Sequence, residues 1–317
     1  MNPPSARHAG GNLHGVVTAA FGRQYEVDVS GHPAAHGSSE AQSRLKCYPR
    51  GKKSVFACGD EVEVTPNSTD QGVIARLHPR RNLLWRSDAF REKLIAANLT
   101  QVVIVVATEP GFSDLLISRC ICAAESQQLT PLIVLNKADL AERLPAARRM
   151  LAPYAELGYR VVELSALEGA QALLPALAGE RSIFVGQSGM GKSTLTNAII
   201  PAARAATREI SEALNSGKHT TTFARLYPLD EGGWLIDSPG LQAFGLAHLT
   251  LDELAASFVE FRDHLGRCRF RDCQHDAEPG CALHAAIAAG TIHRRRFEHY
   301  RLIRDEIGHA QRQSQGW

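Results

Sequence analysis

The sequence predicts a multidomain α/β protein with an N-terminal OB-like β-barrel, a central doubly wound parallel sheet and a C-terminal helical domain. Three observations predict it. Short β-forming runs with turn residues between them fill residues 13–77, buried Val/Ile/Leu runs then alternate with helical segments, and a Cys/His cluster precedes basic helices. We expect a disordered tail at residues 1–12 and domains at residues 13–86, 87–250 and 251–317.

The composition is that of a globular protein, with 44% hydrophobic and 21% charged residues among 317. No apolar run approaches the roughly 18 residues that span a bilayer, and the N-terminus lacks the apolar block of a signal peptide. We therefore expect a cytoplasmic protein, a monomer without a membrane partner. Seven cysteines, three of them clustered near the C-terminus, indicate reduced thiols and a metal site rather than disulfides.

The first predicted domain consists of short strands near residues 15–21, 24–29, 62–64 and 72–77. Between them, RLKCYPRGKKSVF is interpreted as a loop with five cations and two aromatic residues, Tyr48 and Phe56. Such a mixture suits the phosphates and stacked bases of RNA, and an ordinary solvated loop is the alternative.

The segment after the first domain, residues 79–86, carries three arginines and is predicted to be a basic linker. Continuous apolar runs then follow, and they predict parallel strands buried on both faces. These runs lie at residues 101–107, 132–135, 161–164 and 183–185. Helices are expected near residues 113–127, 141–157 and 170–177. In such a doubly wound sheet, ligands bind at the carboxyl ends of the strands.

One of these strands runs into GQSGMGKST, which opens onto a helical run as the Gly-x4-Gly-Lys-Ser/Thr motif requires. The glycines let backbone N–H groups face a phosphate, Lys192 reaches the β- and γ-phosphates, and Ser193 offers a hydroxyl to Mg²⁺. A chance glycine-rich turn is the alternative, which the flanking strand and helix disfavour. The residues predicted to bind phosphate are Gly186, Gln187, Ser188, Gly189, Met190, Gly191, Lys192, Ser193 and Thr194.

A base-reading motif, Asn136-Lys137-Ala138-Asp139, directly follows the strand at residues 132–135. The Asp139 carboxylate can accept hydrogen bonds from N1–H and N2–H₂ of guanine, and adenine has no matching pair of donors. Asn136 is expected to tie this loop to the phosphate loop, and Lys137 to lay its stem along the base. Alone, an NKxD sequence is as often a helix cap; beside a phosphate loop, it predicts GTP rather than ATP.

A third loop, Ser165-Ala166-Leu167, follows the next strand. Strands of a parallel sheet end at the same edge, so this loop is expected beside the base-reading motif. We predict that the Ala166 amide donates a hydrogen bond to guanine O6.

Two further segments are expected to sense the γ-phosphate. In the DSPG motif, Asp237 is predicted to hold Mg²⁺ through water, and the Gly240 amide to contact the γ-phosphate. In the preceding GKHTTT segment, Thr221 is the predicted switch threonine, with Thr220 as the alternative and simple β-propensity as a further interpretation. The predicted Mg²⁺ ligands are Ser193, Thr221 and Asp237.

The order of the motifs is unusual, because the phosphate loop comes first in most GTP-binding domains and follows the base-reading loops here. This order, with a β-domain before it and a cysteine cluster after it, resembles the circularly permuted GTPases, and among them those of bacterial small ribosomal subunit biogenesis. The resemblance extends from about residue 13 to the C-terminal helix. It implies an OB-fold, a zinc-binding helical domain, and hydrolysis of GTP to GDP and phosphate during late maturation of the 30S subunit, with 16S rRNA as a partner. The alternative is a non-catalytic RNA-binding module with a structural guanine-nucleotide site.

A group that orients the attacking water is missing at its usual place, since Leu241 stands where Ras-like enzymes carry a glutamine. A neutral imidazole can orient water near pH 7, so His219 beside the threonines is the best candidate, and the resemblance points to the same residue. A solvated loop histidine is the alternative. The predicted catalytic residues are His219, Thr221 and Lys192.

Near the C-terminus, three cysteines and a histidine with short spacings predict a closed, structural Cys₃His zinc site. The predicted ligands are Cys268, Cys273, His275 and Cys281. His284 is an alternative to His275, and the resemblance favours His275. Helices are expected at residues 282–289 and 292–309. The arginines of the second one suit ribosomal RNA, with a solvated face as the alternative. Residues 241–250 lead into this domain, so γ-phosphate sensing is expected to reposition it.

Overall fold

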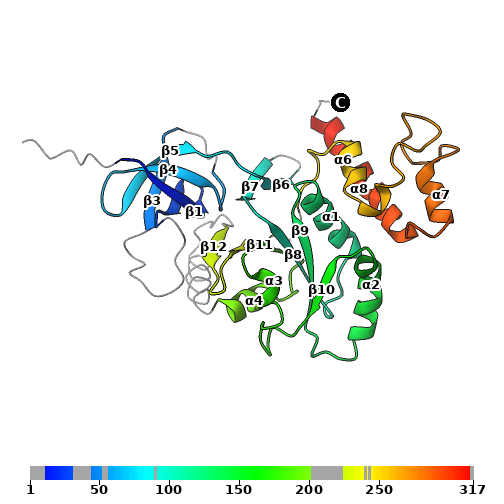
Figure 1. Cartoon of the computed structure of the whole chain (residues 1–317), viewed down its shortest axis with the longest axis horizontal. Coiled ribbons are helices and arrows are strands. Elements are labelled where there is room, and N and C mark those ends of the chain that lie inside the picture. Colours follow the sequence, from blue (N-terminus) through cyan, green and yellow to red (C-terminus); the bar gives the residue numbers. More distant parts are fainter. Residues whose placement is uncertain are drawn as a thin grey trace, which may run out of the picture.

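The computed structural model describes residues 11–30, 44–51, 56–88, 91–200, 224–238, 241 and 244–314. Most of the predicted N-terminal tail lies outside these ranges. The N-terminal barrel, the central sheet with its helices, and the C-terminal helices follow one another across the molecule (Figure 1). None of the helices in the described part of the chain is long and apolar enough to cross a membrane.

The N-terminal domain is a closed five-stranded barrel. Its strand β1 (Leu13–Phe21) pairs with both β2 (Gln24–Asp28) and β4 (Glu61–Pro66), and β3 (Arg44–Pro49) and β5 (Gln71–Leu77) complete the ring. Alternate side chains point inward, as the two-residue period of a strand requires. The barrel core consists of Val17, Tyr25, Val27, Leu45, Cys47, Val62, Val64 and Ile74. The predicted OB-like barrel is confirmed.

Two predictions near this domain are wrong. Residues 44–49 form strand β3 rather than a loop, because Leu45 and Cys47 alternate with outward-facing polar residues and are buried in the barrel. The predicted linker is also structured: β6 (Leu83–Asp88) pairs with β7 (Arg91–Ala97) in an antiparallel hairpin that contributes to the hydrophobic core. The expected boundary at residue 86 therefore falls inside a strand.

The central sheet is parallel apart from strand β12. Its order is β10-β9-β8-β11-β13-β12, and only β12 runs antiparallel to its neighbour β13. The strand bounds are β8 Gln101–Ala107, β9 Thr130–Asn136, β10 Arg160–Glu163, β11 Arg181–Val185, β12 Arg225–Pro228 and β13 Trp234–Asp237. The chain winds from β8 outward to β10 and then crosses to β11 on the other side of β8. The crevice for a ligand is expected at this reversal of strand order.

The helices of the central domain follow the predicted alternation. They are α1 (Asp114–Glu125), α2 (Leu144–Glu156), α3 (Leu174–Leu177) and α4 (Lys192–Ile199). Only α3 is much shorter than predicted, because the residues before Leu174 form turns. The barrel joins this sheet where β1 pairs with β12, and an ion pair of 3.1 Å between Arg225 and Glu26 lies across the junction.

The C-terminal domain contains α6 (Leu251–Ala256), a short 3-10 helix (Val259–Phe261), α7 (Ala282–Ala288) and α8 (Arg294–Ser314). The sequence analysis missed α6, although Thr250 and Glu253 form a capping box at its start. Phe258, Phe261 and Tyr300 form an aromatic core beneath α8. The same helix lies against α1 of the central domain (Figure 1).

Candidate nucleotide and metal sites

The phosphate loop connects the end of β11 to the start of α4, where Lys192 is the first helical residue. Its backbone needs glycine at two crowded places. Gly186 has a φ of 153°, and a Cβ there would meet the carbonyl oxygen of Val105. Gly191 has a φ of 87°, and its Cβ would meet the side-chain amide of Asn136. Both close approaches explain why the motif carries glycine here.

Asn136, at the end of β9, joins three loops through one buried side chain. Its Nδ2 donates to the carbonyl oxygen of Met190 in the phosphate loop at 2.9 Å. Its Oδ1 accepts from the backbone N–H of Lys137 at 2.8 Å and from that of Ala166 at 2.9 Å. With only 1% of its surface exposed, the amide would be costly to leave unpaired. The three predicted recognition loops therefore meet at a single residue.

The Ala166 contact bears on the expected hydrogen bond to guanine O6. The Ala166 N–H that the sequence assigns to this oxygen is donated to Asn136 in this structure. The Ser165 hydroxyl oxygen is buried and lacks a hydrogen-bond partner within the described residues. The neighbouring Leu167 side chain is 83% exposed at the same loop. A buried unpaired hydroxyl and an exposed apolar side chain are together suited to a ligand that this loop contacts.

Residues 108–113, between β8 and α1, form a part of the site that the sequence analysis missed. The Thr108 hydroxyl donates to the carbonyl oxygen of Lys137 at 2.9 Å, and the Lys137 ammonium donates to the carbonyl oxygen of Glu109 at 2.7 Å. The Ser113 N–H donates to Gln187 Oε1 at 3.0 Å. This segment therefore supports both the base-reading loop and the phosphate loop. Nothing in its composition resembles a known motif, so only the fold reveals it.

Lys192 and Asp237 set the electrostatics of the phosphate loop. Burial lowers the pKa of Lys192, and Asp237 opposes this effect. Burial raises the pKa of Asp237, and the Lys192 charge opposes it. The Lys192 ammonium donates to the backbone carbonyl oxygens of Gly186 and, at 2.9 Å, of Gln187. A partly buried cation held against backbone carbonyls is well placed to exchange these contacts for phosphate oxygens.

The structure describes only some of the residues that are predicted to sense the γ-phosphate. His219, Thr220, Thr221 and Gly240 lie outside the described residues. Leu241 is 3% exposed, and its carbonyl oxygen faces the Gly186 N–H at 3.4 Å. It packs into the core beside the phosphate loop and offers no polar group to water.

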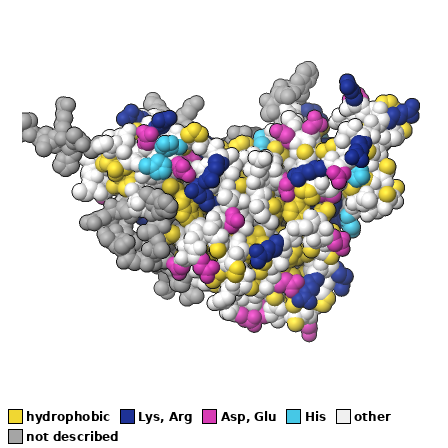
Figure 2. Space-filling model, in the orientation of Figure 1, with side chains coloured by type: hydrophobic (Ala, Val, Ile, Leu, Met, Phe, Trp, Pro, Cys, Tyr) yellow, Lys and Arg dark blue, Asp and Glu magenta, His cyan; other side chains and the backbone are white. Residues whose placement is uncertain are grey.

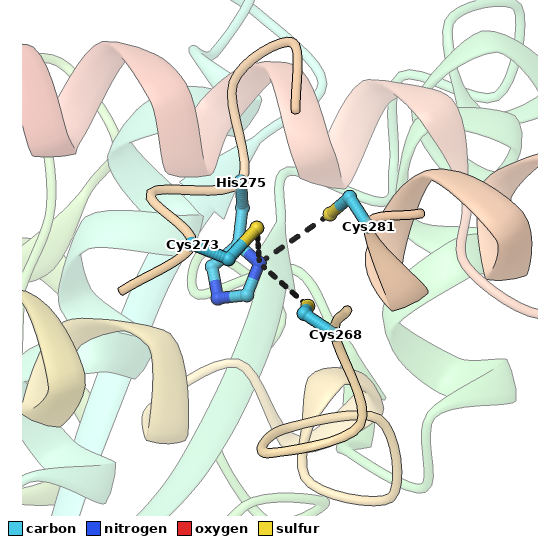
Figure 3. Close-up of side chains that lie close together, drawn as sticks. All are labelled: Cys268, Cys273, His275 and Cys281. Carbon is cyan, nitrogen blue, oxygen red and sulfur yellow. Dashed lines mark hydrogen bonds between the residues drawn. The ribbon is translucent and has the colours of Figure 1, made fainter. Parts of the chain in front are cut away.

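The four predicted zinc ligands come together. Their ligand atoms lie within 4.8 Å of one another, and the three sulfurs stand 3.4–3.6 Å from Nδ1 of His275 (Figure 3). In a tetrahedral site with Zn–S bonds of about 2.3 Å and Zn–N bonds of about 2.0–2.1 Å, sulfur and nitrogen ligands stand roughly 3.6 Å apart. The donor set and its spacing therefore fit a zinc ion.

Contacts around the cluster also suit this role. The Ala282 N–H donates to the Cys268 sulfur at 3.3 Å, a contact that favours a thiolate. His284, the alternative ligand, lies with Nε2 2.6 Å from the carbonyl oxygen of Asp276 and is not part of the cluster. Four protein donors fill all four positions of a tetrahedral ion and leave none open, as in a structural zinc site.

Comparison with known proteins places this geometry in a family. Residues 77–247 match the family model described as RsgA GTPase. A protein of Burkholderia pseudomallei named small ribosomal subunit biogenesis GTPase RsgA is 56% identical over 293 residues, which are 91% of this chain and 90% of that protein.

The chain belongs to the RsgA GTPase family. The crystal structure of YjeQ from Thermotoga maritima superposes with a TM-score of 0.71 at 31% identity, covering 93% of this chain and 98% of that one. The structure of YloQ, described as a circularly permuted GTPase, has the same fold, with a TM-score of 0.68 at 24% identity over 96% of this chain and 98% of that one. The predicted permuted fold and GTPase class are confirmed.

The contact between Gly191 and Asn136 predicts the effect of a single methyl group. In Gly191→Ala, the new Cβ would displace the Asn136 amide and break its bond to Met190. An overpacking cost of about 1–3 kcal/mol, if lost from binding, would weaken GDP binding by roughly 5- to 150-fold, measured by titration calorimetry. The matched control is Gly158→Ala, since Gly158 has a similar φ of 90° but nothing within 4 Å of its Cβ. Equal GDP affinities in the two variants would contradict this role of Gly191.

Zinc removal should unfold the cluster while leaving α6 and α8 in place, because the aromatic core and the contact with α1 hold these helices. Metal binding contributes roughly 10–16 kcal/mol in comparable small zinc sites. We expect one zinc per chain by elemental analysis, and its loss in Cys268→Ala but not in Cys47→Ala, a buried barrel cysteine. After chelation, hydrogen exchange should accelerate across residues 266–290. Unchanged protection there would rule out a structural metal.

Proposed function

We propose that this protein is a Mg²⁺-dependent GTPase that acts as a switch in late maturation of the 30S ribosomal subunit, as a cytoplasmic monomer. The observation that carries the proposal is the junction at Asn136, which holds a phosphate loop and two base-reading loops together. The curated relative named as a small ribosomal subunit biogenesis GTPase supports the choice of the ribosomal subunit.

Guanine recognition rests on the loop after β9. Asp139 is exposed at this loop, where its carboxylate can pair with N1–H and N2–H₂ of guanine. The ammonium of Lys137 is fixed by Glu109, so the stem of this lysine and the exposed Leu167 would cover the two faces of the base. Guanine O6 would accept a hydrogen bond from a backbone N–H of the loop at Ala166. The donor would be either the Ala166 N–H, released from Asn136, or the N–H of the following residue.

The phosphates and Mg²⁺ would occupy the loop before α4. Lys192 would transfer its ammonium from the loop carbonyls to the β- and γ-phosphates. Mg²⁺, held by Ser193, Thr221 and Asp237, supplies positive charge beside the phosphates when bound. Burial raises the pKa of Asp237, so a nearby cation would stabilise its ionised form, which suits a metal ligand. His219 would orient the attacking water, since Leu241 offers no polar group.

Both flanking domains carry surfaces that suit ribosomal RNA, the 16S rRNA. On β3, Arg44, Lys46 and Tyr48 alternate with buried residues and therefore share the outward face of the barrel, where Tyr48 is 42% exposed. Lys and Arg side chains also mark the C-terminal end in Figure 2. Cations interleaved with an exposed aromatic ring can contact phosphates and stack on bases.

The arginines of the C-terminal domain divide into two groups. On α8, Arg295 pairs with Asp114, and Arg296 is 1% exposed against Glu260, so both guanidinium groups are engaged by carboxylates of the protein rather than by RNA. The zinc loop offers a better RNA surface. Arg269 and Phe270 are exposed there, and the Arg269 guanidinium lies 5.4 Å from the Phe270 ring.

The test is phosphate release from GTP with and without purified 30S subunits. We expect strong stimulation by the subunits. His219→Ala should lower the stimulated rate roughly tenfold or more, because a water-orienting group is lost, while GDP affinity stays nearly unchanged. GTP binding without phosphate release, even with subunits present, would contradict the proposal and favour a non-catalytic RNA-binding module.

A second variant separates RNA contact from chemistry in the same assay. Lys46→Glu places a negative charge on the outward face of β3, far from the phosphate loop in sequence and on another domain. It should reduce stimulation by the subunits and leave the intrinsic rate unchanged. Full stimulation of Lys46→Glu would remove the barrel face from the RNA surface.

A further inference from the structure

Helix α1 touches the nucleotide loops at its beginning. Its N-cap residue, Ser113, donates its N–H to Gln187 in the phosphate loop at 3.0 Å. The preceding loop holds Lys137 through Thr108 and Glu109. Any movement of the start of α1 would therefore move the hydrogen-bond partners of both loops.

The first residue of the same helix is also held by the C-terminal domain. Arg295 of α8 donates to both oxygens of the Asp114 carboxylate, at 2.8 and 3.0 Å. Burial opposes ionisation of Asp114, but the hydrogen bonds from Arg295 lower its pKa, so the pair is charged at neutral pH. Such a bidentate contact fixes the relative orientation of the two side chains as well as their distance. Asp114 therefore lies next to Ser113 on one side and beneath α8 on the other.

One turn further along, a buried polar cluster joins the same two helices. The Ser118 hydroxyl is within hydrogen-bond distance of Arg296 Nη1 at 2.7 Å, His299 Nδ1 at 2.8 Å and the Tyr154 hydroxyl at 3.0 Å. Arg296 is paired in turn with Glu260 at 2.8 Å. Burial lowers the pKa of His299 to about 4, so its Nδ1 can accept from Ser118 at pH 7. Tyr154 closes the cluster by donating to the Asp114 carbonyl oxygen at 2.7 Å.

Two more ion pairs continue this contact toward the end of α1. Arg119 pairs with Glu306 of α8, and Glu125 accepts from Arg262 at 2.7 Å. The C-terminal domain thus contacts α1 from its first to its last turn, and several of the polar side chains in this contact are buried. A buried polar cluster tolerates little sliding, because each displaced group would lose its partner.

We propose that α1 couples the docking of the C-terminal domain on the central domain to the geometry of the phosphate loop. Arg295 and Asp114 are therefore positioning residues for nucleotide binding. The inference rests on the proposed function of the nucleotide site. When the C-terminal domain is docked on α1, it fixes the position of Asp114. It thereby also fixes Ser113, the preceding residue, and its hydrogen-bond partner Gln187. Bound nucleotide fixes the same loop. By reciprocity, nucleotide binding strengthens the docking of the C-terminal domain by the same factor as that docking strengthens nucleotide affinity.

The test measures GDP affinity by titration calorimetry in the full chain, loaded with zinc. Arg295→Met and Asp114→Asn should each weaken GDP binding about fivefold or more, the lower end of common coupling effects. The double variant should bind GDP no more weakly than the single variant with the lower affinity, because both substitutions remove the same contact. The Arg295 side chain is 58% exposed, so its loss should leave the fold intact, which zinc content and circular dichroism would verify.

The matched control is Arg148→Met. Arg148 of α2 makes a similar bidentate pair with Glu163 of β10, at 2.9 and 2.6 Å, so this pair joins two elements of the central domain. It should leave GDP affinity within about twofold of wild type, as expected for an exposed pair. A second readout is hydrogen exchange of residues 294–314, which GDP should slow in the wild type and not in Arg295→Met.

GDP affinities equal to wild type in Arg295→Met and Asp114→Asn, with exchange of α8 independent of GDP, would overturn the coupling while leaving the proposed GTPase intact. Failure of the wild type itself to bind GDP would instead overturn the proposed function, and the coupling with it.

Discussion

The nucleotide site depends on one buried amide, that of Asn136. Its carbonyl oxygen accepts two backbone N–H groups and its NH₂ group donates to the phosphate loop, so three loops from three strands share one fixed point. Gly191 must lack a side chain for this amide to fit. Contacts within the protein therefore hold the three loops together, and a preorganised site loses less entropy on binding than a flexible one.

Circular permutation leaves this junction intact because it changes the order of the strands in the chain and not their places in the sheet. β8, β9 and β10 precede β11 in sequence, yet β8 and β11 are neighbours in space. Because the base-reading strands now precede the phosphate loop, the switch strands β12 and β13 end the central domain. There β12 adjoins the barrel, and the chain continues into the C-terminal domain. Both flanking domains thus contact elements next to the candidate nucleotide site: the barrel contacts β12, and the C-terminal domain contacts α1.

Those parts of the protein that are local in sequence could be predicted from it. GQSGMGKST, NKAD and the spacing of Cys268, Cys273, His275 and Cys281 each lie within a short segment, and the structure gathers them into two clusters. The failures involve tertiary contacts. Strand β3 is defined by burial of Leu45 and Cys47 in the barrel. The sequence places the arginines of α8 toward RNA or solvent, but Arg296 is buried against Glu260, which lies 36 residues away in the chain. The contact of Ser118 with His299 joins residues 181 apart, and no sequence pattern indicates it.

The guanine specificity proposed for this site depends on the loops that Asn136 holds together. The most direct test is calorimetric titration of the wild type and of Asn136→Ala with GDP and with ADP. We expect the wild type to bind GDP and reject ADP, since adenine offers no pair of donors to Asp139. We expect Asn136→Ala to lose GDP affinity while remaining folded. Equal affinity for GDP and ADP in the wild type, or unchanged GDP affinity in Asn136→Ala, would contradict this proposal.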